Sequence, residues 1–204
     1  MSGGQLQEMS HQHRLIPVNW KFGTLSDIAN ITMGQSPSGN SYNNEGQGTV
    51  FYQGSTDFGQ VFPVSRMYTT EPSRTAANTD ILLSVRAPVG TMNIAYEDCC
   101  IGRGLASISG KNNTTAFVRY LLMSNSWFFN NINNSGTTFG SIKKDTLFEM
   151  PVLIPEMNII SKFQSIAEPI ELQIYKNEKQ IRELSSLRDW LLPMLMNGQA
   201  TIED

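Results

Sequence analysis

The segment FQSIAEPIELQIYKNEKQIRELSSLRDWLL, residues 163–192, repeats its apolar side chains at intervals of three, four or seven residues. The repeating residues are Phe163, Ile166, Ile170, Ile174, Ile181, Leu184, Leu187 and Leu191. This spacing predicts a single apolar stripe along an α-helix. A helix from about Ile170 to Leu192 would be roughly 35 Å long. Because one small domain cannot bury so long a stripe, we expect a partner helix to cover it.

Prolines and polar residues limit this predicted helix. Pro169 has no backbone N–H, so we expect it to kink the helix or to start a new one. Pro193 and then Asn197-Gly198 are expected to end it. Asn177 and Gln180 lie near the stripe, where a buried polar side chain can set the register of two paired helices.

Residues 20–155 show a different pattern, in which short β-prone segments alternate with Gly, Asn, Pro and Ser. Helix is predicted only within Lys21–Ile31 and over Thr115–Asn131, with Thr114 or Thr115 as the N-cap. The predicted strands are Val50–Tyr52, Ile81–Arg86, Asn93–Tyr96, Ala106–Ser109 and Glu149–Ile154. The mixture predicts an α+β domain with a curled, mostly antiparallel sheet and few helices, followed by a long C-terminal helix of the coiled-coil type.

Three segments follow from these patterns. Residues 1–19 form a polar leader without periodicity, which is typical of a linker. Residues 20–155 form the α+β domain, and residues 156–204 form the helical segment with its tail.

The charge is distributed unevenly along the chain. The net charge is −3, whereas nucleic-acid-binding proteins usually carry a basic surface. Residues 20–155 contain nine basic and nine acidic residues, and residues 156–204 contain five and eight. The acidity therefore belongs to the helical segment. A neutral domain can bind DNA if its few cations share one face, but it would bind weakly and would need a partner to supply further phosphate contacts.

Several classes of protein are disfavoured by what the sequence lacks. No apolar run approaches the roughly 20 residues that span a bilayer, and the leader has no signal-peptide core. Cys99 and Cys100 are adjacent and form no disulfide framework, so a reducing cytoplasm is expected. No phosphate-binding loop, dinucleotide-binding motif, amino-methyltransferase motif or helicase motif occurs. His11 and His13 are far in sequence from the cysteines, so no metal site is expected. We therefore expect no catalytic centre and no cofactor in this chain.

Five stretches and the helical tail together carry a resemblance to a known family. They are WKFGTLSDIANITMGQSPSG from Trp20, YNNEGQGTVFYQGSTDFG from Tyr42, DILLSVRAPVGTMNIA from Asp80, CIGRGLASI from Cys100, TTFGSIKKDTLFEMPVLIP from Thr137, and IRELSSLRDWLLPMLMNGQ from Ile181. In this order they resemble the target-recognition domain and C-terminal helix of DNA specificity (S) subunits of type I restriction-modification systems, over about residues 16–199. The leader resembles the link that enters the second domain of such a subunit, which implies that the chain is the second half.

The resemblance implies a non-catalytic subunit that reads one half of a split double-stranded DNA target. Its implied partners are methyltransferase subunits carrying S-adenosylmethionine and a motor-nuclease subunit using ATP and magnesium, with no membrane involved. The long helix would be a spacer that pairs with another recognition half. We expect an antiparallel homodimer that reads a palindromic split site. The predicted dimer interface consists of Ile170, Ile174, Ile181, Leu184, Leu187 and Leu191. The alternative is a scaffold that binds or sequesters methyltransferase subunits without reading DNA.

Polar residues on the glycine-rich loops are the candidate DNA contacts. Glutamine pairs with adenine edges in the major groove, whereas Ser and Thr mostly contact phosphate. Lys143-Lys144, the only basic pair in the domain, could clamp a phosphate or could occupy an ordinary solvated turn. Arg86 and Arg103 could contact DNA or could pair internally with Asp80 or another carboxylate. The predicted contacts are Gln35, Ser36, Tyr42, Gln53, Thr138, Ser141, Lys143 and Lys144.

Overall fold

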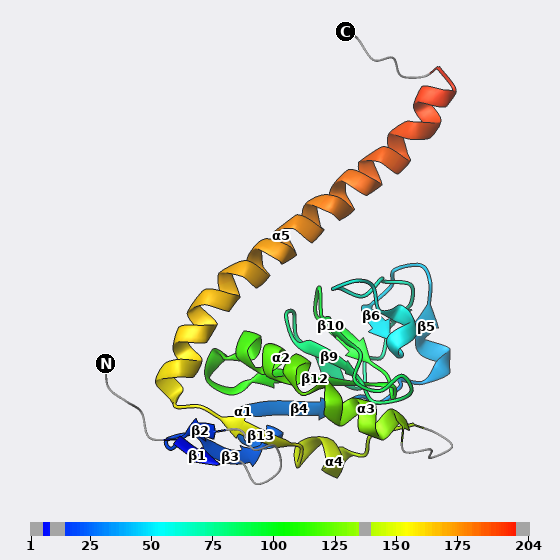
Figure 1. Cartoon of the computed structure of the whole chain (residues 1–204). Coiled ribbons are helices and arrows are strands. Elements are labelled where there is room, and N and C mark those ends of the chain that lie inside the picture. Colours follow the sequence, from blue (N-terminus) through cyan, green and yellow to red (C-terminus); the bar gives the residue numbers. More distant parts are fainter. Residues whose placement is uncertain (1–5, 9–14, 135–139, 199–204) are drawn as a thin grey trace. The chain divides into compact units, whose positions relative to one another are not determined.

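The computed structural model describes residues 6–8, 15–134 and 140–198 of the chain (Figure 1). The chain consists of two compact units, residues 1–164 and residues 165–204. The first unit contains the strands and the short helices, and most of the long helix α5 belongs to the second.

A four-stranded antiparallel sheet forms the centre of the first unit. Its strands are β4 (Ala29–Met33), β9 (Ile81–Ser84), β10 (Met92–Ile94) and β12 (Leu105–Gly110), in the order β10-β9-β12-β4. Strand β9 is buried along its whole length because both faces of the sheet are covered. Ile81 and Leu83 belong to one hydrophobic cluster, and Leu82 between them belongs to a second.

A five-stranded sheet contributes most of the residues of the second cluster. Its strands are β5 (Tyr42–Asn43), β6 (Thr49–Tyr52), β7 (Tyr68–Thr69), β8 (Thr75–Ala76) and β11 (Cys99–Ile101). The order is β5-β7-β6-β11-β8, and only the pairing of β11 with β6 is parallel among the described strands. The predicted α+β class with mostly antiparallel strands is therefore confirmed, although the strands are divided among several sheets.

Two smaller sheets complete the described strands. Strand β3 (Lys21–Thr24) pairs with β13 (Pro151–Ile154), so the two ends of the α+β domain lie side by side. Strand β1 (Leu6–Glu8) pairs with β2 (Leu15–Pro17). These last two strands fall in the polar leader, where no regular structure was predicted.

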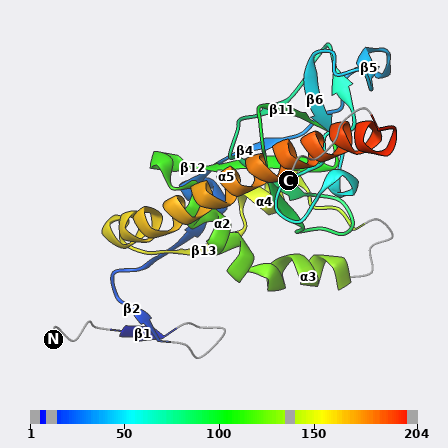
Figure 2. The same ribbon diagram turned by 90° about the horizontal axis from the view of Figure 1, so that it is seen from above.

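The predicted helices of the first unit are present but shorter. Within Lys21–Ile31, only α1 (Leu25–Ile28) is helical, and its N-terminus is stabilised by Asp27, whose carboxylate accepts a bond from the Thr24 N–H at 2.7 Å. Thr115–Asn131 holds two helices, α2 (Thr115–Ser124) and α3 (Ser126–Asn134), whose different directions are visible in Figure 2. The side chain of Asn125 donates to the Leu121 carbonyl at 2.8 Å and marks the break.

The remaining short helices lie in connections. They are η1 (Gly39–Ser41), η2 (Ser55–Asp57), η3 (Lys111–Asn113) and α4 (Lys144–Phe148). Thr114 occupies the N-cap position of α2, as expected, but its hydroxyl donates to the Lys111 carbonyl instead of accepting from the helix.

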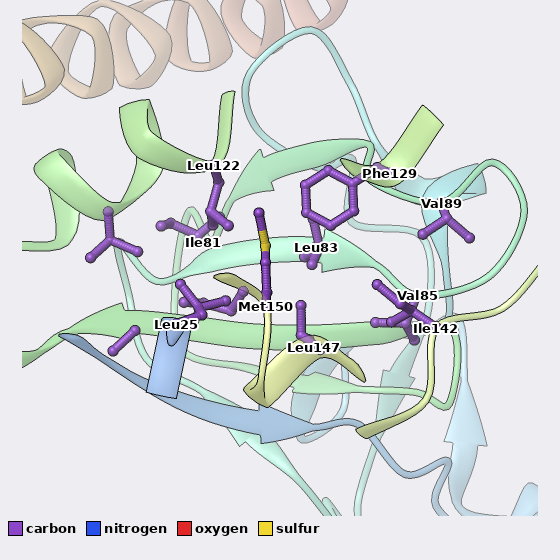
Figure 3. Packing of buried hydrophobic residues seen from close by; sticks show 14 of the residues in the cluster. Leu25, Ile81, Leu83, Val85, Val89, Leu122, Phe129, Ile142, Leu147 and Met150 are labelled. Carbon is purple, nitrogen blue, oxygen red and sulfur yellow. The ribbon is translucent and has the colours of Figure 1, made fainter. Parts of the chain in front are cut away.

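The larger hydrophobic cluster joins segments that are distant in sequence. It contains Ile81, Leu83 and Val85 from β9 and its continuation, Leu122 and Phe129 from the helices, and Ile142, Leu147 and Met150 from the segment around α4. Figure 3 shows Val85 next to Ile142, where the Ile142 N–H also donates to the Val85 carbonyl at 2.8 Å. The core therefore holds residues 140–150 against the end of β9.

Cys99 belongs to the second cluster, Cys100 next to it is also buried, and neither forms a disulfide. Burial, with a smaller contribution from the nearby Asp80 carboxylate, raises the pKa of the Cys99 thiol to about 12.

Helix α5 extends from Met157 to Met196, which confirms the predicted long C-terminal helix (Figure 1). It begins before Ile170 and continues through Pro169, so the alternative in which a new helix starts at Pro169 was wrong. The Gly198 N–H donates to the Leu195 carbonyl, and Gly198 has a φ of +67°, which ends the helix where Asn197-Gly198 predicted an end. Within the described part of the chain, no helix combines the length and the apolar character that crossing a membrane requires.

Candidate nucleic-acid interface

The loop Gly34-Gln35-Ser36-Pro37 follows β4 and is attached to two strands of different sheets. The Gly34 N–H donates to the Leu105 carbonyl at 2.9 Å, and the Gln35 N–H donates to the Ile101 carbonyl at 3.0 Å. A β-carbon at Gly34 would overlap the carbonyl oxygen of Gly102 and would lie 2.8 Å from those of Ile101 and Leu105. Glycine is therefore required here for the close approach of main chains.

The turn Gly102-Arg103-Gly104 is attached in the same way to the end of β6 and the residues that follow it. The Gly102 N–H donates to the Tyr52 carbonyl at 2.8 Å, and the Gly104 N–H donates to the Gln53 carbonyl at 3.2 Å. A β-carbon at Gly104 would lie 2.6 Å from that Gln53 oxygen. Arg103, between the two glycines, is exposed, and its N–H lies 3.4 Å from the Ser36 hydroxyl oxygen.

Two further segments join these loops: residues 85–86 after β9, and the segment that contains Ser141. The Val85 N–H donates to the Gly104 carbonyl at 2.9 Å, and Arg86 forms an isolated β-bridge with Ser141. The Ser84 hydroxyl donates to the Arg86 carbonyl at 2.7 Å, which fixes the main chain at the arginine. Five segments of the sequence are thus brought together by hydrogen bonds, most of them between main-chain groups.

A polar pocket of about 260 Å³ lies among these segments. Its walls are Ser36, residues 53–56, Ser84, Arg86-Ala87 and Arg103-Gly104. No carboxylate is among these lining residues. The neighbouring Asp57 accepts bonds from the Gln53 and Gly54 N–H groups at 2.8 and 3.4 Å, and so stabilises the loop that forms one wall.

The structure places two of the predicted DNA contacts, Ser36 and Gln53, in this pocket. Gln35 and Gln53 are exposed, and Ser141 is exposed beside Arg86. Tyr42 is half-buried, stacks on Phe51 with ring centroids 5.0 Å apart and donates its hydroxyl to the Pro37 carbonyl at 3.0 Å. Its observed contacts therefore support the loop.

The lysine pair lies at the start of α4. Lys143 is exposed at the N-cap position, three residues after Gly140 and two after the bridge residue Ser141. The Lys144 ammonium lies 5.2 Å from the centroid of the Phe148 ring. Thr138, which was also predicted to contact DNA, lies outside the described residues.

Arg86 and Arg103 are additional candidates that the sequence left undecided. The Asp80 carboxylate accepts bonds from the Ser107 hydroxyl at 2.6 Å and from the Ala77 N–H at 3.0 Å. Neither arginine forms an ion pair with any residue that the structure describes, so pairing with Asp80 is not observed. The only sequence signal for these two arginines was that each lies at or next to a predicted β-prone segment.

The side chains of this arrangement are suited to donating hydrogen bonds. Within residues 6–8, 15–134 and 140–198, no three His, Cys, Asp or Glu side chains gather where they could hold a metal ion. Amides, hydroxyls and guanidinium groups on a fixed frame can instead donate hydrogen bonds to phosphate oxygens and to base edges.

Comparisons with known proteins point to one family. The family model described as the type I restriction modification DNA specificity domain matches residues 17–184. A protein of Methanocaldococcus jannaschii named as the MjaX specificity subunit of a type I restriction enzyme is 32% identical over 195 residues, which cover 92% of this chain and 45% of that protein. The HindI specificity subunit of Haemophilus influenzae is 24% identical over 196 residues, covering 90% and 42%. The chain therefore spans less than half the length of these relatives.

Solved structures agree with the sequence matches. The HsdS subunit from Thermoanaerobacter tengcongensis is 30% identical and aligns with a TM-score of 0.60 over 90% of this chain and 46% of its own. A structure described by complex assembly and conformational transition of the type I restriction-modification system is 31% identical, with a TM-score of 0.63 over 90% and 47%. The type I S subunit from M. genitalium is 16% identical and shares the fold, with a TM-score of 0.64 over 93% and 47%.

Replacing Gly34 by alanine tests whether the main-chain frame supports the body of the domain. We expect Gly34→Ala to lower the free energy of unfolding by about 1–3 kcal/mol or more, because the methyl group must displace backbone atoms. Gly39→Ala is the matched control, since a β-carbon there meets nothing within 4 Å. Urea denaturation measures both changes, and equal midpoints for the two variants would contradict the assignment.

Proposed function

Since the chain belongs to the family of type I restriction-modification DNA specificity domains, we propose that it recognises one half of a split double-stranded DNA target. The observation that carries this proposal is the convergence of five polar segments on one main-chain frame. The frame places Gln53, Arg86 and Arg103 in one pocket and Gln35 on the adjoining loop, and the bridge between Arg86 and Ser141 lies two residues before the lysine pair.

These groups suit different parts of a DNA duplex. The two glutamine amides can pair with adenine edges in the major groove. The serine hydroxyls and Lys143 can contact phosphate, which positions the duplex without selecting a sequence. Because the frame is fixed by hydrogen bonds before DNA arrives, little ordering is needed on binding.

Partner subunits would supply what this chain lacks. The residues of the first unit provide few cations, so DNA binding by the chain alone should be weak. We propose that methyltransferase subunits dock on the chain, carry S-adenosylmethionine and flip the target adenine. A motor-nuclease subunit with ATP and magnesium would join them, and the chain itself would remain non-catalytic.

Helix α5 is proposed to pair with the helix of another recognition half. Ile170, Ile181, Leu184 and Leu187 have 49–65% of their surface exposed on this helix. Ile174 and Leu191, the other predicted interface residues, are half-buried. Ion pairs between Lys179 and Glu183 at 4.0 Å and between Arg182 and Glu178 at 2.8 Å lie among the charged residues of the helix. An antiparallel pair of such helices would set the distance between two half-sites.

A scaffold that only binds or sequesters methyltransferase subunits is the second candidate function, and the exposed apolar residues of α5 favour it.

The two candidate functions differ in whether this chain selects the DNA sequence that is methylated. With methyltransferase subunits present, we expect a gel shift on target DNA, and mapping of methylated adenines in cells carrying the gene should give one split motif. The variant Gln35→Ala/Gln53→Ala should lose or alter that motif. Methylation that is absent or independent of this chain would support the scaffold.

The lysine pair gives a test of the phosphate clamp. We expect Lys143→Ala/Lys144→Ala to weaken binding of the assembled complex to all DNA sequences alike. The slope of log affinity against log salt should become shallower by roughly 1–2, since each phosphate contact contributes about 0.9. Titrations at several salt concentrations measure the slope. Lys176→Ala/Lys179→Ala on α5 removes the same charge as a control, and an unchanged slope for the first variant would exclude the clamp.

Pairing through α5 predicts the oligomeric state. We expect the chain to sediment as a dimer and Ile181→Asp/Leu184→Asp to sediment as a monomer at the same concentration. Each apolar side chain contributes about 1.5–3 kcal/mol when buried, so the dissociation constant should rise at least about a hundredfold. Lys176→Asp, a change in charge outside the predicted stripe, should leave the dimer intact. A wild-type chain that stays monomeric at high concentration would rule out the pairing.

A further inference from the structure

The pocket lined by Arg86 and Arg103 combines cationic and hydroxyl groups without an acidic residue among its lining residues. We infer that this pocket seats one phosphate group of the DNA backbone, with the two guanidinium groups as its cationic ligands. The inference deepens the proposed function, on which it rests, by assigning a sequence-independent contact to a defined place in the interface.

The two arginines have no acidic partner among the described residues. Both side chains are exposed, and neither forms an ion pair with a described residue. Asp80, the carboxylate that the sequence offered as a partner, is bound to Ser107 and to the Ala77 N–H. Asp57, the acidic residue next to the pocket, accepts main-chain bonds within its own loop. The guanidinium donors are therefore available to a ligand.

The walls of the pocket combine guanidinium groups with hydroxyl groups. Ser36, Ser55 and Thr56 add hydroxyl groups that can donate, whereas Ser84 already donates to the Arg86 carbonyl. A site with two guanidinium groups, several hydroxyl donors and no carboxylate matches a ligand that is anionic and rich in acceptor oxygens. A phosphate group fits this description, and the 260 Å³ of the pocket leaves room for the adjoining sugar.

The backbone at each arginine is held in place by hydrogen bonds to neighbouring segments. Arg103 lies between Gly102 and Gly104, whose main chains are packed against residues 52–54. Arg86 follows a fully buried strand and is bridged to Ser141. Both are held by the same frame that carries Gln35 and Gln53. A phosphate seated between them would fix the register of the duplex relative to those two amides.

The continuity of the surface favours DNA over a free anion. Gln53 belongs to the pocket itself, and Ser141 connects Arg86 to the lysine pair along the chain. A backbone phosphate at this place would therefore have its neighbouring nucleotides beside groups that can contact them. Free inorganic phosphate shares the chemistry of the ligand but would use none of these neighbours.

Salt titration of DNA binding tests the inference without knowledge of the target. The chain is titrated onto an arbitrary duplex of about 30 base pairs between about 50 and 200 mM salt. Arg86→Met/Arg103→Met should reduce affinity at the lowest salt at least about tenfold, and should make the salt slope shallower by about 0.9. Lys21→Met/Arg66→Met removes the same charge from exposed residues outside the pocket and serves as the control. Arg86→Lys/Arg103→Lys should restore the slope but only part of the affinity, because lysine lacks the planar fork.

A second measurement follows the pocket directly. The arginine Nε–H signals of Arg86 and Arg103 are assigned by nuclear magnetic resonance with the single Met variants, and the chain is titrated with inorganic phosphate and then with duplex. Shifts of both signals with duplex, at concentrations where inorganic phosphate has little effect, support the backbone site.

The outcomes separate this inference from the proposed function. Equal slopes for the pocket variant and its control, with normal DNA binding by the wild-type chain, would overturn the phosphate seat alone. Signals that shift with inorganic phosphate but not with duplex would replace DNA by a free anion. If the chain does not bind DNA and neither signal responds to phosphate, the seat is also refuted.

Discussion

Close main-chain contact at Gly34, Gly102 and Gly104 is the constraint on which the rest of the domain's polar surface depends. At each of these positions a β-carbon would collide with, or be crowded by, a neighbouring main chain. The loop after β4, the segment after β6 and the turn after β11 are therefore stacked backbone on backbone. Exposed side chains on these loops, such as Gln35 and Gln53, can vary in identity without moving the backbone, because most of the contacts that place the loops are between main-chain groups.

The hydrophobic core extends this frame to the remaining segments. Strand β9 is buried on both faces, so its end is fixed by two clusters at once. Ile142 belongs to the same cluster as Val85. Because of this packing, the segment before α4 lies beside Arg86. A polar surface built from distant parts of the chain is thus positioned by apolar packing below it.

The sequence predicted those parts of the fold that depend on local pattern. The apolar repeat from Phe163 to Leu191 predicted the long helix, and short β-prone runs predicted the central strands. The break at Asn125 was not predicted, because it results from one side-chain bond to the Leu121 carbonyl that a periodic pattern does not contain. No new helix starts at Pro169, because α5 continues through this residue although it lacks a backbone donor. The gathering of Ser36, Gln53, Arg86 and Arg103 depends on contacts across up to 67 residues of sequence, for which spacing carries no signal.

The reactivity of the two cysteines depends on local opening of the strand that contains them. Cys99 and Cys100 belong to β11, which leads directly into Gly102, and the Cys99 thiol has its pKa raised to about 12 by burial. Because the thiolate is the reactive form, the folded strand should be chemically inert near neutral pH. The rate at which these thiols are modified therefore measures how often β11 detaches. This modification rate reports how often the stacked main chains beside the pocket open locally.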